Sequence, residues 1–142
     1  MKLHACLLLA AGILFARSHT ELNGTWVLQP TGSNFNGQPV MQTGTVTINE
    51  REGDITVSRN FAYEGAKDTF FYKDMIDSEN NATIHADVKS KARWDHDVLK
   101  VTTTTHSGAV TVERYSLTAS GSMTVNVDKP GSQPVTLVFV RK

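Results

Sequence analysis

The stretch Thr45–Tyr63, TVTINEREGDITVSRNFAY, contains the pattern that decides the fold. Apolar residues alternate with polar ones on both sides of a short turn, with Val46 and Ile48 before it and Ile55 after it. Successive side chains of a β-strand point to opposite faces, so this period of two predicts two strands that each bury one face. Glu52-Gly53-Asp54 predicts the turn between them, and the stretch is therefore interpreted as an antiparallel hairpin.

The same pattern continues on both sides of the hairpin. We find no segment of ten or more residues with a helical period, and threonine and valine, which favour pleated surfaces, are abundant. Turn sequences separate further strands, which are predicted at 24–29, 67–74, 82–89, 91–95, 98–106, 109–117, 123–127 and 135–141, and residues 30–44 predict a loop.

This succession of short strands, joined mostly by tight turns, predicts an all-β fold. An open sheet of this size would leave two exposed edges, and closure removes both. We therefore expect an antiparallel up-and-down β-barrel of about 8–10 strands. A β-sandwich of two sheets is the alternative.

The composition is that of one globular domain without a charge bias. Its 142 residues allow a single core, and Lys+Arg and Asp+Glu number 14 each, which gives a net charge of zero. Nucleic acids and anionic membrane surfaces attract proteins with a basic excess. The overall charge therefore predicts no nucleic-acid partner.

The N-terminal residues predict a signal peptide for export. A short basic segment precedes an uncharged run, ACLLLAAGILFA at 5–16. The run is too short for a membrane-spanning helix, which needs about 20 residues, and is typical of the apolar part of a signal peptide. Small residues in an A-x-S pattern predict cleavage after Ser18, and cleavage after Ala16 or Thr20 is an alternative.

Cleavage at this point gives a signal peptide at 1–18 and a barrel domain at 19–142. The chain's one cysteine, Cys6, lies inside the apolar run and not after it, so lipidation there is not expected. The domain itself would contain no cysteine and would have to fold without disulfides. The predicted location is secreted or periplasmic, with no stable membrane span after cleavage, and an uncleaved N-terminal anchor is the alternative.

Short motifs along the domain resemble the calycins. Gly24-Thr25-Trp26 resembles the G-x-W with which lipocalins, fatty-acid-binding proteins and avidins begin. Together with ARWD at 92–95, the opening GTWVLQP is similar to small secreted bacterial lipocalin-like proteins of unknown role, and the last three strands are similar to the end of fatty-acid-binding proteins. The resemblance implies that Trp26 plugs the closed end of the barrel and that Arg141 lies across it, in a cation–π contact worth about 0.5–2 kcal/mol.

Departures from these families bear on function. Fatty-acid-binding proteins cover the barrel mouth with a helix–turn–helix, whereas residues 30–44 contain Pro30, Pro39 and three glycines, which predicts no such lid. Their last strand carries an R-x-Y pair that grips a carboxylate, and the matching positions here are Leu137 and Phe139. Avidins need several tryptophans at the binding site, and this chain has two in all. The resemblance therefore implies a barrel without the usual carboxylate grip.

Two arginines are candidates for a site inside the barrel. Arg59 falls on the apolar face of its strand, and Arg114 shares a face with two valines and matches an upstream arginine of fatty-acid-binding proteins. A buried charge is costly without a partner. Inside a barrel, each arginine is therefore expected to meet an anionic ligand head group. The alternatives are an ion pair with Glu64, Glu113 or Asp68, a buried water, or plain exposure at the surface.

Tyrosines complete the predicted ligand-binding set of Arg59, Tyr72, Arg114 and Tyr115. Aromatic side chains are numerous in the strands, and such side chains line apolar cavities as well as cores. Packing in a core or across strands is the alternative for the aromatic residues.

No metal site, cofactor or catalytic residue is predicted. His85, Asp87 and the turn Asp95-His96-Asp97 do not supply three or four converging metal ligands, and the sequence lacks G-x-S-x-G and H-E-x-x-H. The leading hypothesis is a binding protein for a small apolar or amphipathic ligand. The alternatives are a structural or protein-interaction module whose barrel is filled by side chains and, after it, a lipocalin-like isomerase.

Overall fold

The computed structural model describes residues 19–75, 82–85 and 88–142, and the side chains of 19–68 and 88–142 within them. This part of the chain contains two short 3₁₀ helices, Thr20–Leu22 and Pro30–Gly32, and no helix long and apolar enough to cross a membrane. The rest of the regular structure is β1 (Gly24–Leu28), β2 (Met41–Arg51), β3 (Asp54–Tyr63), β4 (Ala66–Met75), β5 (Ala82–His85), β6 (Val88–Asp95), β7 (Val98–Thr104), β8 (Val110–Leu117), β9 (Met123–Asp128) and β10 (Val135–Arg141).

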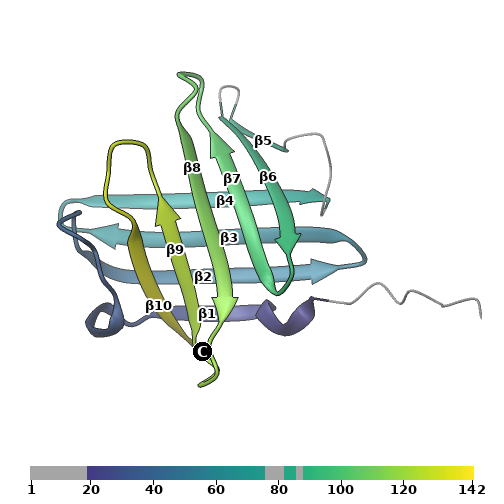
Figure 1. Ribbon diagram of the computed structural model, residues 1–142, viewed down its shortest axis with the longest axis horizontal. Helices are drawn as coiled ribbons and strands as arrows, with labels where there is room; N and C mark the ends of the chain where they lie inside the picture. The colour runs from purple at the N-terminus through teal and green to yellow at the C-terminus, as the bar shows by residue number, and fades with distance from the viewer. Residues whose placement is uncertain (1–18, 76–81, 86–87) are drawn as a thin grey trace, which may run out of the picture.

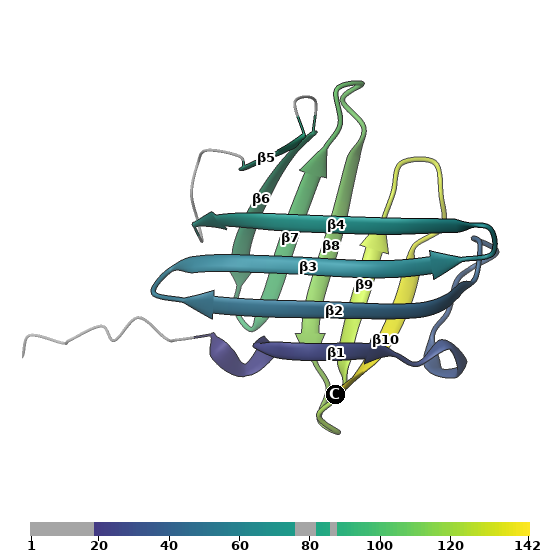
Figure 2. The ribbon, with the colours of Figure 1, turned by 180° about the vertical axis from the view of Figure 1, so that it is seen from behind.

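The strands form one antiparallel sheet that curls into a barrel. Its order is β4-β3-β2-β1-β10-β9-β8-β7-β6-β5, so consecutive strands pair except β4 with β5, and the first strand pairs with the last. Figures 1 and 2 show two layers, because β1 to β4 run across the molecule and β6 to β10 cross them. The predicted all-β, up-and-down barrel is confirmed, since a sandwich would divide the strands between two sheets. In the described residues no ladder joins β4 to β5, and these strands form the two ends of the sheet.

The hairpin of β2 and β3 forms as the alternation predicts. Arg51 pairs with Asp54, which leaves Glu52 and Gly53 as the turn, with φ angles of 54° and 88°. Positive φ at both positions is the geometry of a type I′ turn, whose twist matches that of the flanking strands. The aliphatic residues on the predicted inner faces are buried.

Two predicted strand boundaries are wrong. β2 begins at Met41, inside the predicted loop, because this side chain is buried in the core and pairs with Tyr63 across an irregular register. β6 begins at Val88 and runs through Ser90, where the sequence predicted a division between strands. Ser90 is buried, and its hydroxyl lies 2.7 Å from that of Thr103 on β7. Because this hydroxyl has a partner on the neighbouring strand, a polar residue can occupy an inward-facing position of β6. The alternation of apolar and polar residues alone does not reveal such a position.

Trp26 closes one end of the barrel. Its side chain is fully buried, and its indole Nε1 donates a 2.9 Å hydrogen bond to the carbonyl oxygen of Leu22. The guanidinium of Arg141 lies over the ring, with Cζ 4.2 Å from the ring centroid, and donates to the carbonyl oxygens of Glu21 and Asn23. The structure thus places both side chains where the resemblance implied, and the last strand holds the first 3₁₀ helix over the end of the barrel.

Gly24 is expected to tolerate no side chain. Its φ is 132°, and a methyl group added there would lie 2.5 Å from Nη1 of Arg141. Gly24→Ala is therefore expected to lower the free energy of unfolding by about 1–3 kcal/mol, because an L-residue is strained at this φ and the arginine must move. Chemical denaturation measures the loss.

Gly121→Ala is the matched control for this substitution. Gly121 also has a positive φ, 83°, but no atom would lie within 4 Å of the added methyl group. The control therefore reports backbone strain without displacement of Arg141. Equal losses in the two variants would contradict a contribution from the arginine.

Candidate functional site

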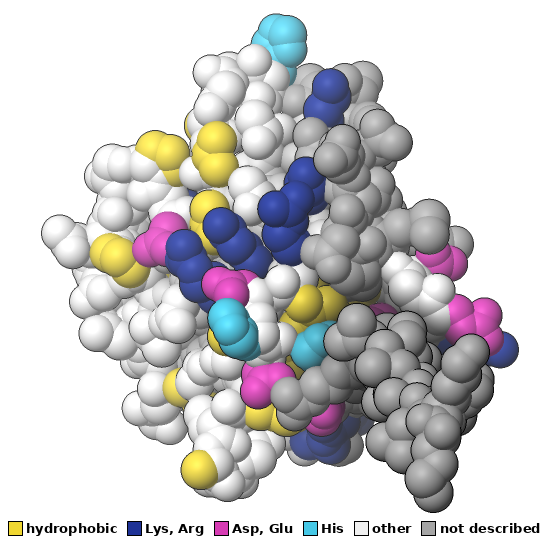
Figure 3. Space-filling model, turned by 45° about the vertical axis from the view of Figure 1, so that its right-hand side comes forward, with side chains coloured by type: hydrophobic (Ala, Val, Ile, Leu, Met, Phe, Trp, Pro, Cys, Tyr) yellow, Lys and Arg dark blue, Asp and Glu magenta, His cyan; other side chains and the backbone are white. Residues whose placement is uncertain are grey.

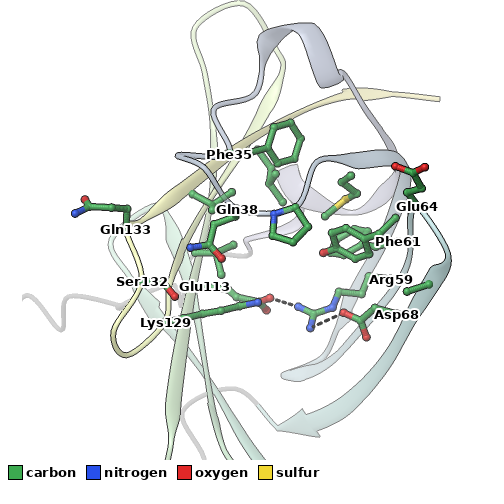
Figure 4. Close-up of a pocket in the computed structure, with 17 residues that line it drawn as sticks. Phe35, Gln38, Arg59, Phe61, Glu64, Asp68, Glu113, Lys129, Ser132 and Gln133 are labelled. Carbon is green, nitrogen blue, oxygen red and sulfur yellow. Dashed lines mark hydrogen bonds and ion pairs between the residues drawn. The ribbon is translucent and has the colours of Figure 1, made fainter.

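A cavity of about 550 Å³ opens where the segment after β1 meets the β3–β4 and β9–β10 turns (Figure 4). This volume lies within the range of about 300–1,000 Å³ that is typical of small-molecule sites. Apolar and aromatic side chains form much of the wall: Phe35, Met41, Phe61, Tyr63, Val127, Val135 and Leu137.

Residues 33–40, which we call the covering segment, form one side of this cavity. Asn34 pairs with Thr136 of β10 through two backbone hydrogen bonds of 2.7 and 2.9 Å. The hydroxyl of Ser33 accepts a hydrogen bond from the backbone N–H of Val138. Phe35 packs against the core. The segment is therefore fixed to β10 as irregular chain, without the helix–turn–helix that the resemblance to fatty-acid-binding proteins would imply there.

Arg59 is the buried cation of the cavity wall. Its side chain is 16% exposed, and its Nη1 donates to Oε1 of Glu113. Its Nη2 lies 3.6 Å from Oδ2 of Asp68, and its Cζ lies 5.3 Å from the ring centroid of Phe61 (Figure 4). The arginine thus points inward, as the alternation predicted. Its partners in the structure are protein carboxylates, which the sequence had left as the alternative to a ligand.

Glu113 and Tyr115 extend this network into the core. The Glu113 side chain is 5% exposed, and its Oε2 accepts a 3.0 Å hydrogen bond from the hydroxyl of Tyr115. Burial raises the pKa of the Tyr115 hydroxyl, and the nearby charge of Arg59 opposes that shift. Tyr115 therefore lies behind Glu113, where it orients the carboxylate and does not line the cavity.

Tyr115→Phe is expected to lower the free energy of unfolding at neutral pH. It is also expected to make that free energy fall less steeply as pH rises above 10. The variant loses a hydrogen bond to a carboxylate, which is worth about 1.5–3 kcal/mol. In the native protein the raised pKa means that the unfolded chain releases the tyrosine proton first, near pH 10, so stability falls as pH rises further. The variant lacks this contribution. Urea denaturation between pH 7 and pH 11 measures both effects, and parallel curves above pH 10 would contradict the second.

The expected inward orientation of Arg114 is wrong. Glu113 and Tyr115 on either side of it are buried, so Arg114 points to the outer face of β8. Its side chain is 41% exposed and pairs with Asp128 of β9. The alternation along residues 110–117 separates two faces correctly, but the face with two valines is the outer one, because Tyr115 packs in the core.

The outer face beside Arg114 is basic. Figure 3 shows Lys and Arg side chains gathered on this side of the molecule. Lys91, Arg93 and Lys100, from β6 and β7, line a shallow groove of about 200 Å³ there, and Lys100 is the register partner of Arg114. The zero net charge of the sequence therefore conceals a local excess of positive charge.

One further predicted residue lies on a strand, and several cavity residues that the sequence did not predict lie on loops. Tyr72 is opposite Val57 in the β3–β4 ladder, but its side chain lies outside the described residues. Phe35, Gln38 and Lys129 line the cavity without having been predicted, because they come from loops whose path no periodicity encodes. The signal that could have found them is the proline- and glycine-rich composition that marks these segments as loops near a barrel opening.

Among the described residues, no three His, Cys, Asp or Glu side chains gather closely enough to hold a metal ion. His96 lies exposed in its turn at a φ of 55°, with its Nδ1 2.9 Å from Oδ1 of Asp95. The side chain of His85, and all of Asp87, lie outside the described part of the chain.

No protein-family model matches the sequence, and no curated protein matches it. Solved structures do match its fold. A Schistosoma mansoni fatty acid binding protein in complex with arachidonic acid is 16% identical with a TM-score of 0.65, over 89% of this chain and 99% of that one. Lipid binding protein 8 of Caenorhabditis elegans, in its apo form, is 12% identical with a TM-score of 0.66, over 90% and 100%.

A third match widens the range of proteins with this fold. A secretory abundant heat soluble protein of Ramazzottius varieornatus is 10% identical with a TM-score of 0.62, over 86% of this chain and 96% of that one. At these identities the likeness shows the fold alone. The chain adopts the calycin-like β-barrel fold that the fatty-acid-binding proteins share.

Proposed function

We propose that this chain is a binding protein for a small apolar or amphipathic ligand. The cavity of about 550 Å³ carries the proposal, because an apolar wall with a few polar groups is typical of small-molecule sites. Solved proteins of the same fold that transport or bind fatty acids support it. The role proposed is binding and not catalysis.

The lining suggests how such a ligand would lie. Phe35, Phe61 and Leu137 offer surfaces against which a hydrocarbon chain would bury itself. Gln38 and Ser132 belong to the same wall and offer neutral hydrogen-bonding groups to a polar end. A molecule with an apolar body and one polar end therefore fits the lining better than a wholly polar one.

Native mass spectrometry of protein purified from its host, without added lipid, tests the proposal. The expected result is a population with additional mass that disappears on denaturation and is recovered by organic extraction. Protein that has been freed of this ligand and refolded, which we call stripped protein, is expected to bind the uncharged dye Nile red with enhanced fluorescence. A single unliganded mass together with no Nile red binding would overturn the proposal and favour a filled, structural barrel.

Two tryptophan variants locate the binding. Ala66 is exposed and lines the cavity, so Ala66→Trp is expected to fill the opening and reduce Nile red binding by about tenfold, or 1.4 kcal/mol. Ala119 is exposed in the β8–β9 turn and does not line the cavity, so Ala119→Trp is the matched control. Equal binding by both variants would place the dye elsewhere.

We also propose that the protein is exported, with its signal peptide at 1–18 removed. The apolar run of the sequence supports this, although those residues lie outside the described part of the chain. Cleavage after Ser18 would leave His19 at the N-terminus, and its ring stacks on Trp94 with centroids 4.1 Å apart. The domain would then begin at a residue that the barrel itself holds.

N-terminal sequencing of protein recovered from the medium or the periplasm tests export. The expected mature terminus is His19, with Arg17 or Glu21 expected for the alternative cleavage sites. Recovery from the cytoplasm with Met1 retained would contradict it.

A further inference from the structure

The cavity carries more negative than positive groups. Among the described residues that line it, the cations are Arg59 and Lys129 and the carboxylates are Glu64, Asp68 and Glu113. Glu64 and Lys129 are exposed at the rim. Arg59 and Glu113 are the buried charges, with side chains 16% and 5% exposed. The charge that a ligand would meet inside the cavity is therefore set by these two residues and by the half-exposed Asp68.

The guanidinium of Arg59 is already engaged by acidic groups of the protein. Nη1 donates to Glu113, and Nη2 lies 3.6 Å from Asp68, which approaches from β4. Glu113 is itself fixed, since its second oxygen accepts the hydroxyl of Tyr115 at 3.0 Å. Three strands thus hold an arginine between two carboxylates (Figure 4).

A ligand carboxylate could reach this arginine only at a cost. It would have to displace Glu113, which would leave a buried carboxylate without its cation, or join as a third negative group around one guanidinium. Like charges a few ångströms apart repel strongly where water is largely excluded. An uncharged hydroxyl or amide meets neither obstacle, because it can donate to a free lone pair of Asp68 or Glu113 and displace nothing.

We propose that the cavity selects an amphiphile with an uncharged hydroxyl or amide head group over one with a carboxylate. This inference rests on the proposed binding function and names the substrate class of that same cavity. It departs from the arachidonic acid that the Schistosoma mansoni protein of the same fold binds. The departure follows from the pairing of Arg59 with Glu113.

Ligands that differ only in the head group provide the test. Isothermal titration of stripped protein with 1-dodecanol, dodecanamide and dodecanoate at pH 8, each below its solubility limit, gives the three affinities. The expected result is that the alcohol or the amide binds at least about tenfold more tightly than the carboxylate, a difference of about 1.4 kcal/mol. Equal or tighter binding of dodecanoate would overturn the inference.

Glu113→Gln tests the cause of the preference. The amide keeps the size of the side chain and an acceptor for Tyr115, but it removes the charge that neutralises Arg59. Dodecanoate affinity is expected to rise by about tenfold or more, with little change for 1-dodecanol. Glu64→Gln is the matched control, because it makes the same change of net charge at an exposed position of the rim. An equal rise in both variants would show a general charge effect and contradict the role of the pair.

A second variant keeps the test decisive if Glu113→Gln does not fold. Asp68 is half-exposed, and its carboxylate is the second one beside Arg59. Asp68→Asn removes that negative charge at a position closer to the surface than Glu113. A smaller rise in dodecanoate affinity is expected, and no rise would contradict the inference. If none of the three compounds binds to wild type and Nile red also fails to bind, the proposed function itself falls. If Nile red binds and dodecanoate is preferred, only the head-group inference falls.

Discussion

Trp26→Ala is expected to lower the free energy of unfolding by about 3–5 kcal/mol, as is usual when a buried tryptophan is truncated. The side chain is fully buried, its Nε1 donates to Leu22, and Arg141 stacks on its outer surface. Truncation would therefore open the closed end of the barrel and remove the surface on which the last strand holds the first 3₁₀ helix. Urea denaturation followed by circular dichroism measures the loss.

Trp26→Phe separates packing from the hydrogen bond at the same position. Phenylalanine keeps an aromatic surface beneath Arg141 but has no donor for the carbonyl oxygen of Leu22. We expect a loss of about 1–3 kcal/mol, the cost of an unsatisfied buried group. A loss below 1 kcal/mol for Trp26→Ala would contradict the closing role of this residue.

Arg59→Met is expected to cost about 3–5 kcal/mol, because it leaves Glu113 buried without its cation. Methionine is apolar and of similar length, so the change removes the charge and leaves much of the contact with Phe61. The free energy of unfolding, measured by urea denaturation at pH 7, reports the loss. Arg51→Met is the control for replacing an arginine by methionine, because the Arg51 side chain is 82% exposed and its partner Glu52 is equally exposed.

The double variant Arg59→Met/Glu113→Gln is expected to recover much of this loss. With both charges removed, neither is left buried alone, and a neutral pair in a protein interior is often as stable as an ion pair. A coupling free energy of about 0.5–3 kcal/mol between the two changes is expected. Additive losses would show that the residues act independently and would remove the basis of the head-group inference.

The fold was predictable because its signals are local. The period of two between Thr45 and Tyr63, with Glu52 and Gly53 at the turn, determines the hairpin without reference to the rest of the chain. The position of Trp26 and Arg141 came from resemblance, since residues from the two ends of a domain show no local relation. The start of β2 at Met41 was missed because pairing with Tyr63 overrides a loop-like composition.

The site was only partly predictable, because it depends on which face of each strand turns inward. Alternation assigned the face of Arg59 correctly, since Val57 and Phe61, two positions away on either side, are apolar and buried. The same reasoning failed for Arg114, because Val110 and Val112 lie on the outer face of β8, and the burial of Glu113 and Tyr115 determines the inner one. The pairing of Arg59 with Glu113 joins residues 54 positions apart, and no pattern in one strand reveals it.

The pairing of β1 with β10 determines when the barrel can be completed. Arg141 donates to the carbonyl oxygen of Asn23 across 118 positions of the chain, and contacts of such long range make folding slow. During synthesis β1 can pair with β2 early, but it cannot pair with β10 until every other strand has been made. The inner side chains of the sheet therefore stay accessible to chaperones throughout that interval.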